Sequence, residues 1–222
     1  MALKILYEDN HLIAVFKPAG LLVQGDETGD VSLMDEVKAY LKETYHKPGN
    51  VFLGLVHRLD RPVGGIVVFA KTSKGASRLS EQFRSHTVEK MYHAVVSGLP
   101  KENSGKLVNY LIKNPVKNIV AAYNKPRLGA EKAVLSYEVV SSNGKNTLLK
   151  INLETGKPHQ IRAQLSHNGH PIVGDVKYGS REPFQDKAIA LAATSISFKL
   201  ATKEEVKYLE IEMPKEWQKY LE

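Results

Sequence analysis

The sequence predicts an α+β protein whose sheet is mostly antiparallel. Segments typical of strands outnumber helical ones, most connections between them are short, and the Asn-Gly pair at 143–144 marks a hairpin. The 222 residues are enough to bury a substantial core. Because no long linker rich in Gly, Ser or Pro divides the chain, residues 1–222 are expected to form one domain.

Three stretches in the first hundred residues favour strands. Residues 4–20 predict a strand pair that turns at Glu8–Asn10. Residues 66–70 form an apolar run typical of a buried strand. Residues 89–98 predict a further strand, and its period of two places Tyr92 on one face.

Two segments in the same half favour helices. Residues 32–45 begin with Ser32, a suitable N-cap, and Asp35 completes a capping box three residues later. Residues 73–86 predict a second helix, with Ser73 as its expected cap.

The second half contains a hairpin, one helix and a short C-terminal series of elements. Residues 133–140 and 146–154 flank the Asn143-Gly144 turn and predict the hairpin. A helix is expected between Pro158, which suits a first helical turn, and Gly169, which suits a helix end. The remaining expected elements are strands near Ile196–Leu200 and Tyr208–Met213, and a helical turn around Trp217.

Composition favours a polyanionic partner and excludes several kinds of chemistry. The chain carries 31 Lys and Arg against 24 Asp and Glu, a formal charge of +7, which suits RNA or DNA. The absence of cysteine excludes disulfides, thiolate catalysis and cysteine zinc sites. No apolar stretch is long enough to span a bilayer and no signal peptide is visible, so a cytoplasmic protein is expected.

One polar segment interrupts what should be core. The stretch HRLDRPVGG, residues 57–65, lies between the apolar runs VFLGLV and IVVFA. Buried charges are unfavourable unless they are paired and hydrogen-bonded, so the segment is either a solvent-facing rim or a site. Residue spacing alone favours the solvent-facing rim, in which Arg58 and Asp60 would form a salt bridge.

A second polar concentration covers residues 155–179, TGKPHQIRAQLSHNGHPIVGDVKYG. On the expected helix, Ile161 and Leu165 should face the core, and His159 and Arg162 share a neighbouring stripe. The glycine-rich part that follows is typical of a loop shaped around a ligand. Taken alone, Arg162 can equally be a solvated helix residue.

Three chemical interpretations compete at this point. A metal-dependent hydrolase has suitable residue types but no HExxH or similar spacing. A nucleic-acid-binding module without chemistry fits the charge, although no zinc-finger or RRM pattern is visible. An enzyme acting on an RNA base would use Asp60 as the reactive carboxylate, Arg162 as its charge partner and Tyr92 to stack on an extruded base. The metal interpretation rests on His57, Asp60, His159, His167, His170 and Asp175.

Four motifs in order resemble those of the RluA-type RNA pseudouridine synthases, in the form without an N-terminal RNA-binding module. The similarity extends over almost the whole chain. The matching stretches are KPAGLLV (17–23), HRLDRPVGGIVVFAKT (57–72), EKMYHAVVSG (89–98) and the whole of residues 155–179.

The resemblance implies a bent, mixed and mostly antiparallel sheet with flanking helices and a central RNA-binding cleft. It implies an isomerase that converts uridine to pseudouridine in rRNA or tRNA. The glycosidic carbon–nitrogen bond breaks, the base turns within the site, and C5 bonds to the ribose. No cofactor and no metal are expected, the partner is RNA rather than a membrane, and the protein is expected to be a monomer.

The resemblance also assigns site residues. Asp60 corresponds to the essential aspartate, Tyr92 to the tyrosine that packs on the target base, and Arg162 to the arginine that pairs with the aspartate. Arg58 corresponds to the arginine that replaces the flipped nucleotide, and Leu191 to an apolar pocket residue. The other expected substrate-binding residues are His57, His159 and Gln160.

The sequence departs from the family pattern at four positions. Val63 and Gly64 replace the usual Thr-Ser, which removes any hydroxyl contact there. Lys157 replaces a frequent arginine and Gln164 a frequent histidine, and both changes could alter RNA contacts.

Overall fold

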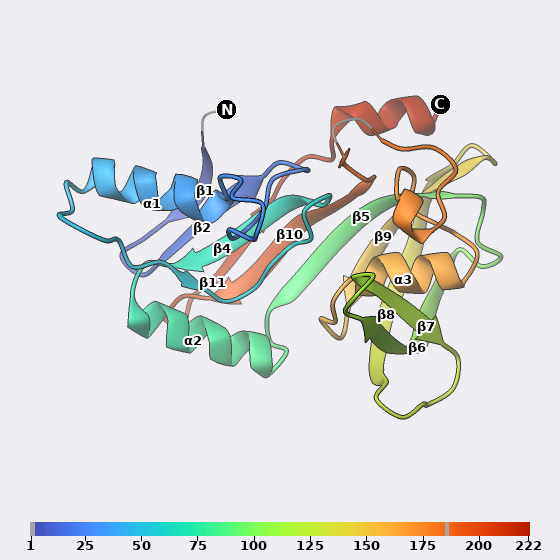
Figure 1. Cartoon of the computed structure of the whole chain (residues 1–222), viewed down its shortest axis with the longest axis horizontal. Helices are drawn as coiled ribbons and strands as arrows, with labels where there is room; N and C mark the ends of the chain where they lie inside the picture. The colour runs from blue at the N-terminus through green and yellow to red at the C-terminus, as the bar shows by residue number, and fades with distance from the viewer. Residues whose placement is uncertain (1–2, 185–186) are drawn as a thin grey trace. The chain divides into compact units, whose positions relative to one another are not determined.

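The computed structural model describes residues 3–184 and 187–222, and the chain forms two compact units (Figure 1). The first unit comprises Met1–Glu89 and Ala193–Ile211, and the second comprises Lys90–Ala192 and Glu212–Glu222. Both contain an antiparallel-dominated set of strands and few helices, which confirms the predicted α+β class. The expectation of one domain over residues 1–222 stays a prediction.

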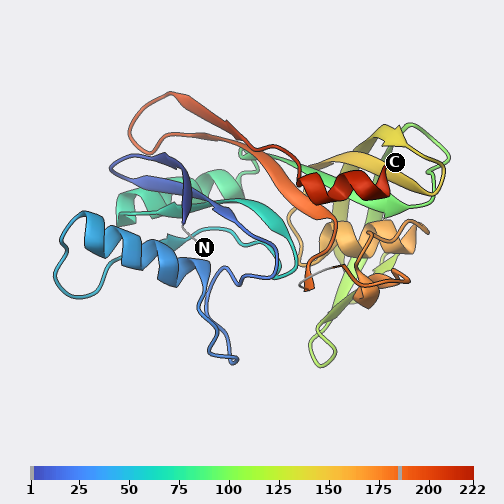
Figure 2. The same cartoon turned by 90° about the horizontal axis from the view of Figure 1, so that it is seen from above.

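The sheet of the first unit contains the predicted N-terminal strand pair. β1 and β2 pair antiparallel, with Glu8 opposite Ile13, and Asp9 caps the turn by accepting from the backbone N–H of Leu12. β10 and β11 form a long hairpin, clearest in Figure 2. The strand order is β1 (Lys4–Glu8), β2 (Leu12–Lys17), β4 (Gly64–Ala70), β10 (Leu191–Lys199) and β11 (Val206–Glu210), and the short β3 (Gly54–Leu55) also pairs with β4.

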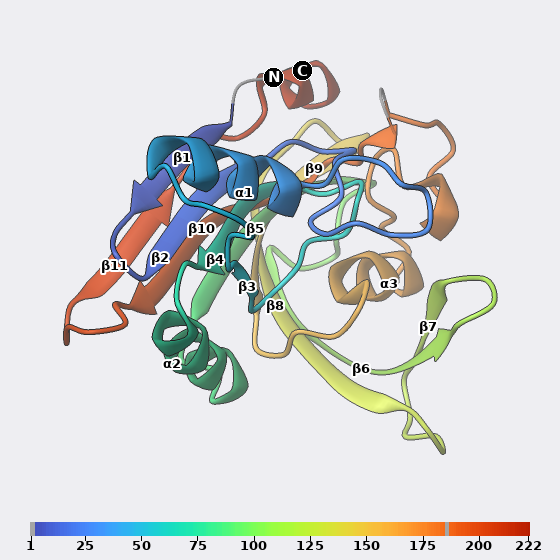
Figure 3. The ribbon, with the colours of Figure 1, turned by 60° about the vertical axis from the view of Figure 1, so that its left-hand side comes forward.

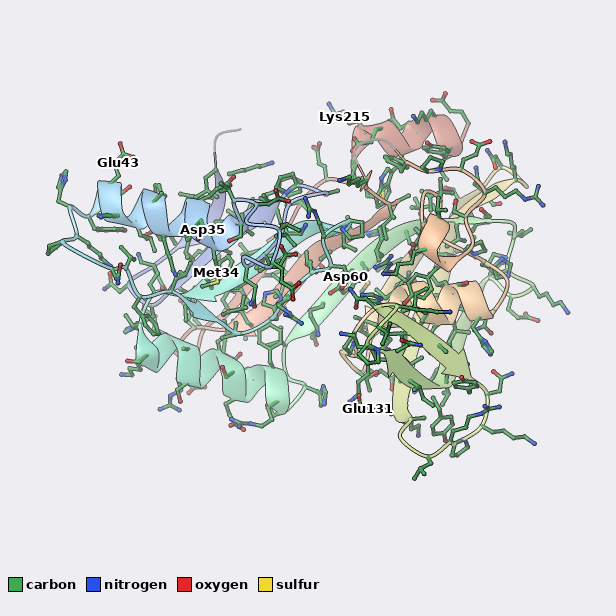
Figure 4. All side chains as sticks on the ribbon, viewed as in Figure 1. Met34, Asp35, Glu43, Asp60, Glu131 and Lys215 are labelled. Atoms are coloured by element: carbon green, nitrogen blue, oxygen red, sulfur yellow. The ribbon has the colours of Figure 1, made fainter. Side chains whose placement is uncertain are left out.

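Helix α1 (Leu33–Thr44) confirms the predicted capping box. The Ser32 hydroxyl accepts from the backbone N–H of Asp35, and the Asp35 carboxylate accepts from the backbone N–H of Ser32. Figure 4 shows Asp35 at the start of α1 and Glu43 near its end.

Helix α2 (Ser73–Arg84) begins one residue earlier than the predicted cap implies. Thr72 is the N-cap: its backbone is extended and its hydroxyl accepts from the backbone N–H of Gly75 at 3.1 Å. Ser73 is therefore the first helical residue, so the predicted cap is wrong. Leu79 of α2 packs into a core with Ile66, Val68 and Phe198.

The second unit has the strand order β5 (Glu89–Ser97), β9 (Asn146–Leu153), β8 (Glu131–Ser142), β6 (Ser104–Asn114) and β7 (Ile119–Tyr123). The hairpin of β8 and β9 is confirmed, and Gly144 in its turn has a φ of +84°. The strands β6 and β7 had no sequence-based prediction. In Figure 3 these strands and β8 lie beneath helix α3.

Helix α3 (Gln160–His167) is shorter than predicted. His159 is its N-cap and adopts a left-handed conformation with φ +50°, so Pro158 lies outside the helix rather than in its first turn. The helix ends before Gly169 as expected, and Ile161 and Leu165 are buried as expected.

The C-terminal elements agree in kind with the prediction. β10 starts earlier than residue 196 and β11 ends at Glu210, before the predicted limit at Met213. The turn around Trp217 is a 3-10 helix, η3 (Lys215–Tyr220), and the Trp217 side chain is buried. None of the helices in residues 3–184 and 187–222 has the length and apolar character needed to cross a membrane.

Candidate active site

The HRLD segment lies in the first unit, between β3 and β4, and Figure 4 labels Asp60 there. The Asp60 carbonyl accepts from the backbone N–H of Val63 at 3.0 Å, which closes a turn. Gly20 and Arg61 exchange two bonds: the Gly20 N–H donates to the Arg61 carbonyl at 2.8 Å, and Arg61 Nε donates to the Gly20 carbonyl at 3.0 Å. Arg61 also forms an ion pair with Asp30. Hydrogen bonds therefore hold the residues around Asp60 against the segment that follows β2.

Lys17, the last residue of β2, adds a third connection. Its side chain is completely buried, and Nζ donates to the carbonyls of Pro18, Leu21 and Arg61 at 3.0, 2.7 and 3.1 Å. Burial lowers the pKa of Lys17 to about 7, an effect that the carboxylate of Asp60 opposes and the charge of Arg61 reinforces. We did not predict Lys17 as a site residue, although a lysine that directly follows an apolar strand within a family motif was an available signal.

His57 supports this segment from within the first unit. Its Nε2 accepts the backbone N–H of Val68 at 2.9 Å, so the ring is neutral with its proton on Nδ1. The ring also stacks on Phe83, with centroids 4.7 Å apart. This arrangement anchors the start of the HRLD segment to β4. Arg58, one residue further, is exposed.

Tyr92 and Leu191 are buried residues of the second unit. Tyr92 lies on β5 opposite Ile151 of β9 and is 8% exposed. Leu191 is 3% exposed and its N–H donates to the Ile189 carbonyl at 2.7 Å.

Arg162 on α3 is a buried charge, so its interpretation as a solvated helix residue is wrong. Nε and Nη2 of Arg162 donate to the two carboxylate oxygens of Asp175 at 2.7 and 2.9 Å. The side chains are 6% and 1% exposed. The guanidinium also lies 4.8 Å from the ring centroid of Tyr178, in the 3-10 turn η1 (Val176–Tyr178). Neither Asp175 as a partner of Arg162 nor Tyr178 was predicted.

His159 and Gln160, the residues before Arg162, have different surroundings. His159 Nδ1 lies 2.8 Å from the Tyr178 hydroxyl, and the ring is partly exposed. Gln160 is buried: its Oε1 accepts from Thr155 and from the backbone N–H of Lys157, and its Nε2 donates to the Val134 carbonyl. Gln160 therefore braces the turn before α3.

The departures from the family pattern fit the local packing. Val63 is buried, and a Cβ on Gly64 would make only ordinary contacts, at 3.5 Å or more. Lys157 forms an ion pair with Glu131. Gln164 is completely buried and donates to Asn109 Oδ1 at 2.9 Å, while its Oε1 has no hydrogen-bond partner among residues 3–184 and 187–222.

The structure thus brings the predicted residues into two local arrangements, one in each unit. In the first unit, Asp60 lies in a segment fastened by Lys17, His57 and Arg61. In the second unit, Arg162 and His159 share contacts with the turn Asp175–Tyr178. In the part of the chain that the structure describes, no group of three His, Asp or Glu side chains is placed to hold a metal ion.

Comparison with known sequences identifies the family. Residues 11–167 match the model of the family described as RNA pseudouridylate synthase. The chain is 37% identical over 191 residues to a protein of Haemophilus ducreyi named tRNA pseudouridine synthase C, covering 81% of this chain and 75% of that protein. It is 33% identical over 215 residues to the Vibrio cholerae protein of the same name, covering 88% and 85%. It is 36% identical to the ribosomal large subunit pseudouridine synthase C of Vibrio vulnificus, covering 80% of this chain and 53% of that one.

Solved structures agree on the fold. The human protein RNA pseudouridylate synthase domain containing 4 aligns with a TM-score of 0.80 and 24% identity, over 97% of this chain and 90% of that one. The human domain containing 1 protein aligns with a TM-score of 0.75 and 21% identity, over 99% and 86%. The motifs, the fold and the sequence matches agree, and the chain belongs to the RluA-type group of the RNA pseudouridylate synthase family.

Proposed function

We propose that this protein isomerises uridine to pseudouridine in RNA, with Asp60 as the reactive group. The observation that carries the proposal is the family match over residues 11–167, which contains Asp60, Tyr92 and Arg162 within their motifs. The fastening of the HRLD segment by Lys17 and Arg61 supports it, because a reactive carboxylate gains rate from a fixed position.

The proposed reaction needs no second substrate. Asp60 acts covalently on the nucleotide, at the base or at the sugar, and the bond between N1 and C1′ breaks. The base turns while it is held, C5 bonds to C1′, the bond between Asp60 and the nucleotide breaks, the proton on C5 leaves, and N1 takes up a proton. Product and substrate are isomers, so no water or acceptor has to be activated and a single carboxylate suffices.

The remaining site residues have the roles that the family motifs suggest. Tyr92 packs on the target base and assists proton movement, and Arg162 pairs with Asp60. Arg58 occupies the space of the flipped nucleotide, whose extrusion requires a few kcal/mol of unstacking energy. Leu191 and His159 contact the nucleotide, whereas His57 and Gln160 act through the segments that they anchor.

The substrate class follows from the relatives and from charge. The relatives are named for tRNA and for large-subunit ribosomal RNA, so the target is a uridine in one of these RNAs. A formal charge of +7 favours binding to a phosphate backbone. We further propose that the protein works as a monomer in the cytoplasm and uses neither a metal nor a cofactor.

The decisive variant is Asp60→Asn, which preserves shape and removes the charge. We expect it to abolish pseudouridine formation while its RNA affinity changes by less than about threefold, since backbone contacts dominate RNA binding. Total RNA from cells with the gene, without it, and with the variant would be mapped for pseudouridine, and purified protein would then be assayed on the identified RNA. Asp26→Asn, at an exposed position, is the matched control.

Two outcomes would contradict the proposal. Robust turnover by Asp60→Asn would remove Asp60 from the chemistry. A wild-type protein that binds RNA but forms no pseudouridine would instead indicate a binding module without catalysis.

A further inference from the structure

We propose that the turn Asp175–Tyr178 positions the two polar side chains at the start of α3, Arg162 and His159, for the isomerisation. This inference rests on the proposed function and assigns roles to Asp175 and Tyr178. Neither residue needs to touch the RNA. Each acts through a side chain that does.

Asp175 fixes the plane of the Arg162 guanidinium. A single bond would leave the group free to rotate, but the two bonds to Nε and Nη2 hold one edge of its planar fork. These bonds use two of the five N–H groups of arginine. The other N–H groups of the planar guanidinium are thereby held in fixed directions.

Tyr178 contributes with its ring and with its hydroxyl. The ring lies 4.8 Å from the guanidinium and limits movement of Arg162 out of the plane set by Asp175. The hydroxyl accepts the backbone N–H of Val120 at 2.8 Å, so its own proton is available to Nδ1 of His159, also at 2.8 Å. When the hydroxyl donates to Nδ1, the neutral imidazole of His159 carries its proton on Nε2, which can then donate to an oxygen of the nucleotide.

Stability alone does not account for the ion pair. Two buried charges lose hydration, and an apolar pair of similar volume is often at least as stable. Arg162 and Asp175 are 6% and 1% exposed, so this loss is nearly complete for both. A role in orienting Arg162 gives the pair a function that an apolar pair would not provide.

The first test is Asp175→Asn, assayed at saturating RNA. Asparagine keeps the shape but offers one acceptor oxygen instead of two charged ones. We expect kcat to fall about 100-fold, because a small misplacement of a reacting group causes a loss of this size. We expect KM to change by less than about threefold. Val176→Thr, exposed on the same turn, is the matched control and should keep wild-type kcat.

A double-mutant cycle separates positioning from a purely structural role. Arg162→Ala leaves Asp175 as an uncompensated buried charge and should lower the melting temperature. Adding Asp175→Asn should restore the melting temperature, because the stranded charge is gone, yet kcat should stay at the Arg162→Ala level.

A second arm tests Tyr178. Tyr178→Phe keeps the ring but removes both the bond to His159 and the acceptor of the Val120 N–H, and we expect kcat to fall about 2- to 10-fold. In the His159→Ala background, Tyr178→Phe should cause no further loss of kcat.

Three results would overturn the inference: near-wild-type kcat in Asp175→Asn, an additive loss of kcat in the double mutant with Arg162→Ala, or an undiminished Tyr178→Phe effect in the His159→Ala background. Each of these leaves the proposed function intact. Absence of pseudouridine formation by the wild-type protein would instead overturn the proposed function.

Discussion

The Asp60 segment of the first unit and the Arg162 segment of the second unit are held by different means. Around Asp60 the fastening is mostly to main-chain atoms: the carbonyls of Pro18, Leu21 and Arg61 all accept from Lys17. Around Arg162 the fastening is between side chains, through the ion pair with Asp175 and the Tyr178 ring.

This difference has consequences for how each segment responds to change. Main-chain contacts tolerate many substitutions, but they depend on close backbone packing and on one buried cation. Side-chain contacts tolerate backbone adjustment, but removal of one partner leaves a buried charge uncompensated. The Asp60 segment and the Arg162 segment should therefore be destabilised by different classes of mutation.

The largest expected effect is that of Gly65→Ala in β4. Gly65 has a φ of +132°, and a Cβ would lie 2.4 Å from the carbonyl oxygen of Ala193 in the same unit. Because the obstacle is backbone, we expect a loss of more than about 4 kcal/mol in the free energy of unfolding, measured with urea.

The matched substitution in the second unit is Gly174→Ala, next to Asp175. Its φ is +88°, and a new Cβ would meet the Cβ of Phe184, which is bonded directly to the backbone, but only this one atom lies within 3.0 Å, whereas Gly65 has three such atoms, all of them backbone. We expect a smaller loss of about 2 kcal/mol. Equal losses for the two alanine variants would contradict the expectation that three close backbone atoms are a larger obstacle than one close atom.

Local signals in the sequence were sufficient for much of the fold. The capping box of Ser32 and Asp35 and the Asn143-Gly144 hairpin both depend on residues close in sequence, and both were predicted. Thr72 and Ser73 are adjacent hydroxyl residues, and sequence alone did not decide which one caps α2. Strand β6 was missed because polar residues interrupt its apolar pattern, whereas β7, IVAAY, is apolar throughout and was missed although its sequence carries a strand signal.

The candidate site was predictable only where polar residues interrupt a recognisable pattern. The HRLD segment was visible as a polar stretch between two apolar runs. The contacts that hold it were not, since Lys17 reaches the Arg61 carbonyl across 44 positions. Asp175 lies 13 positions from Arg162, beyond the end of α3, so no helical period relates the two.

An intermediate effect is expected for Lys17→Met, which tests the fastening of the first unit. The change removes the Lys17 donor from three carbonyls, of which that of Arg61 keeps another donor, the Gly20 N–H, and we expect a loss of about 2–4 kcal/mol in the free energy of unfolding near neutral pH. Pseudouridine formation should also fall, because the HRLD segment is less fixed. Lys74→Met on α2, at an exposed position, should change neither quantity.

The same variant should alter how stability depends on pH. Burial lowers the pKa of Lys17 from 10.5 to about 7, so between these values the folded state binds fewer protons at this group than the unfolded state. The stability contribution of Lys17 therefore rises with pH through that window, by at most about 1.4 kcal/mol per pH unit. The difference between wild type and Lys17→Met should widen between pH about 7 and about 9. A constant difference across that range would contradict the lowered pKa.

The smallest effect is expected where the chain departs from the family motif, at Val63. The backbone N–H of Val63 donates to the Asp60 carbonyl. A threonine at position 63 can therefore also donate its side-chain hydroxyl to this nearby carbonyl. We expect Val63→Thr to change the free energy of unfolding by less than about 1 kcal/mol.

Val67→Thr provides the matched control, because Val67 is completely buried within β4. Its hydroxyl would enter an apolar layer, and we expect a loss of about 2 kcal/mol. Activity of Val63→Thr should remain within about threefold of wild type, since the Asp60 segment is held through main-chain atoms and Lys17. A large gain in kcat for Val63→Thr would show instead that a hydroxyl at this position takes part in orienting Asp60, and that fastening through the main chain is incomplete.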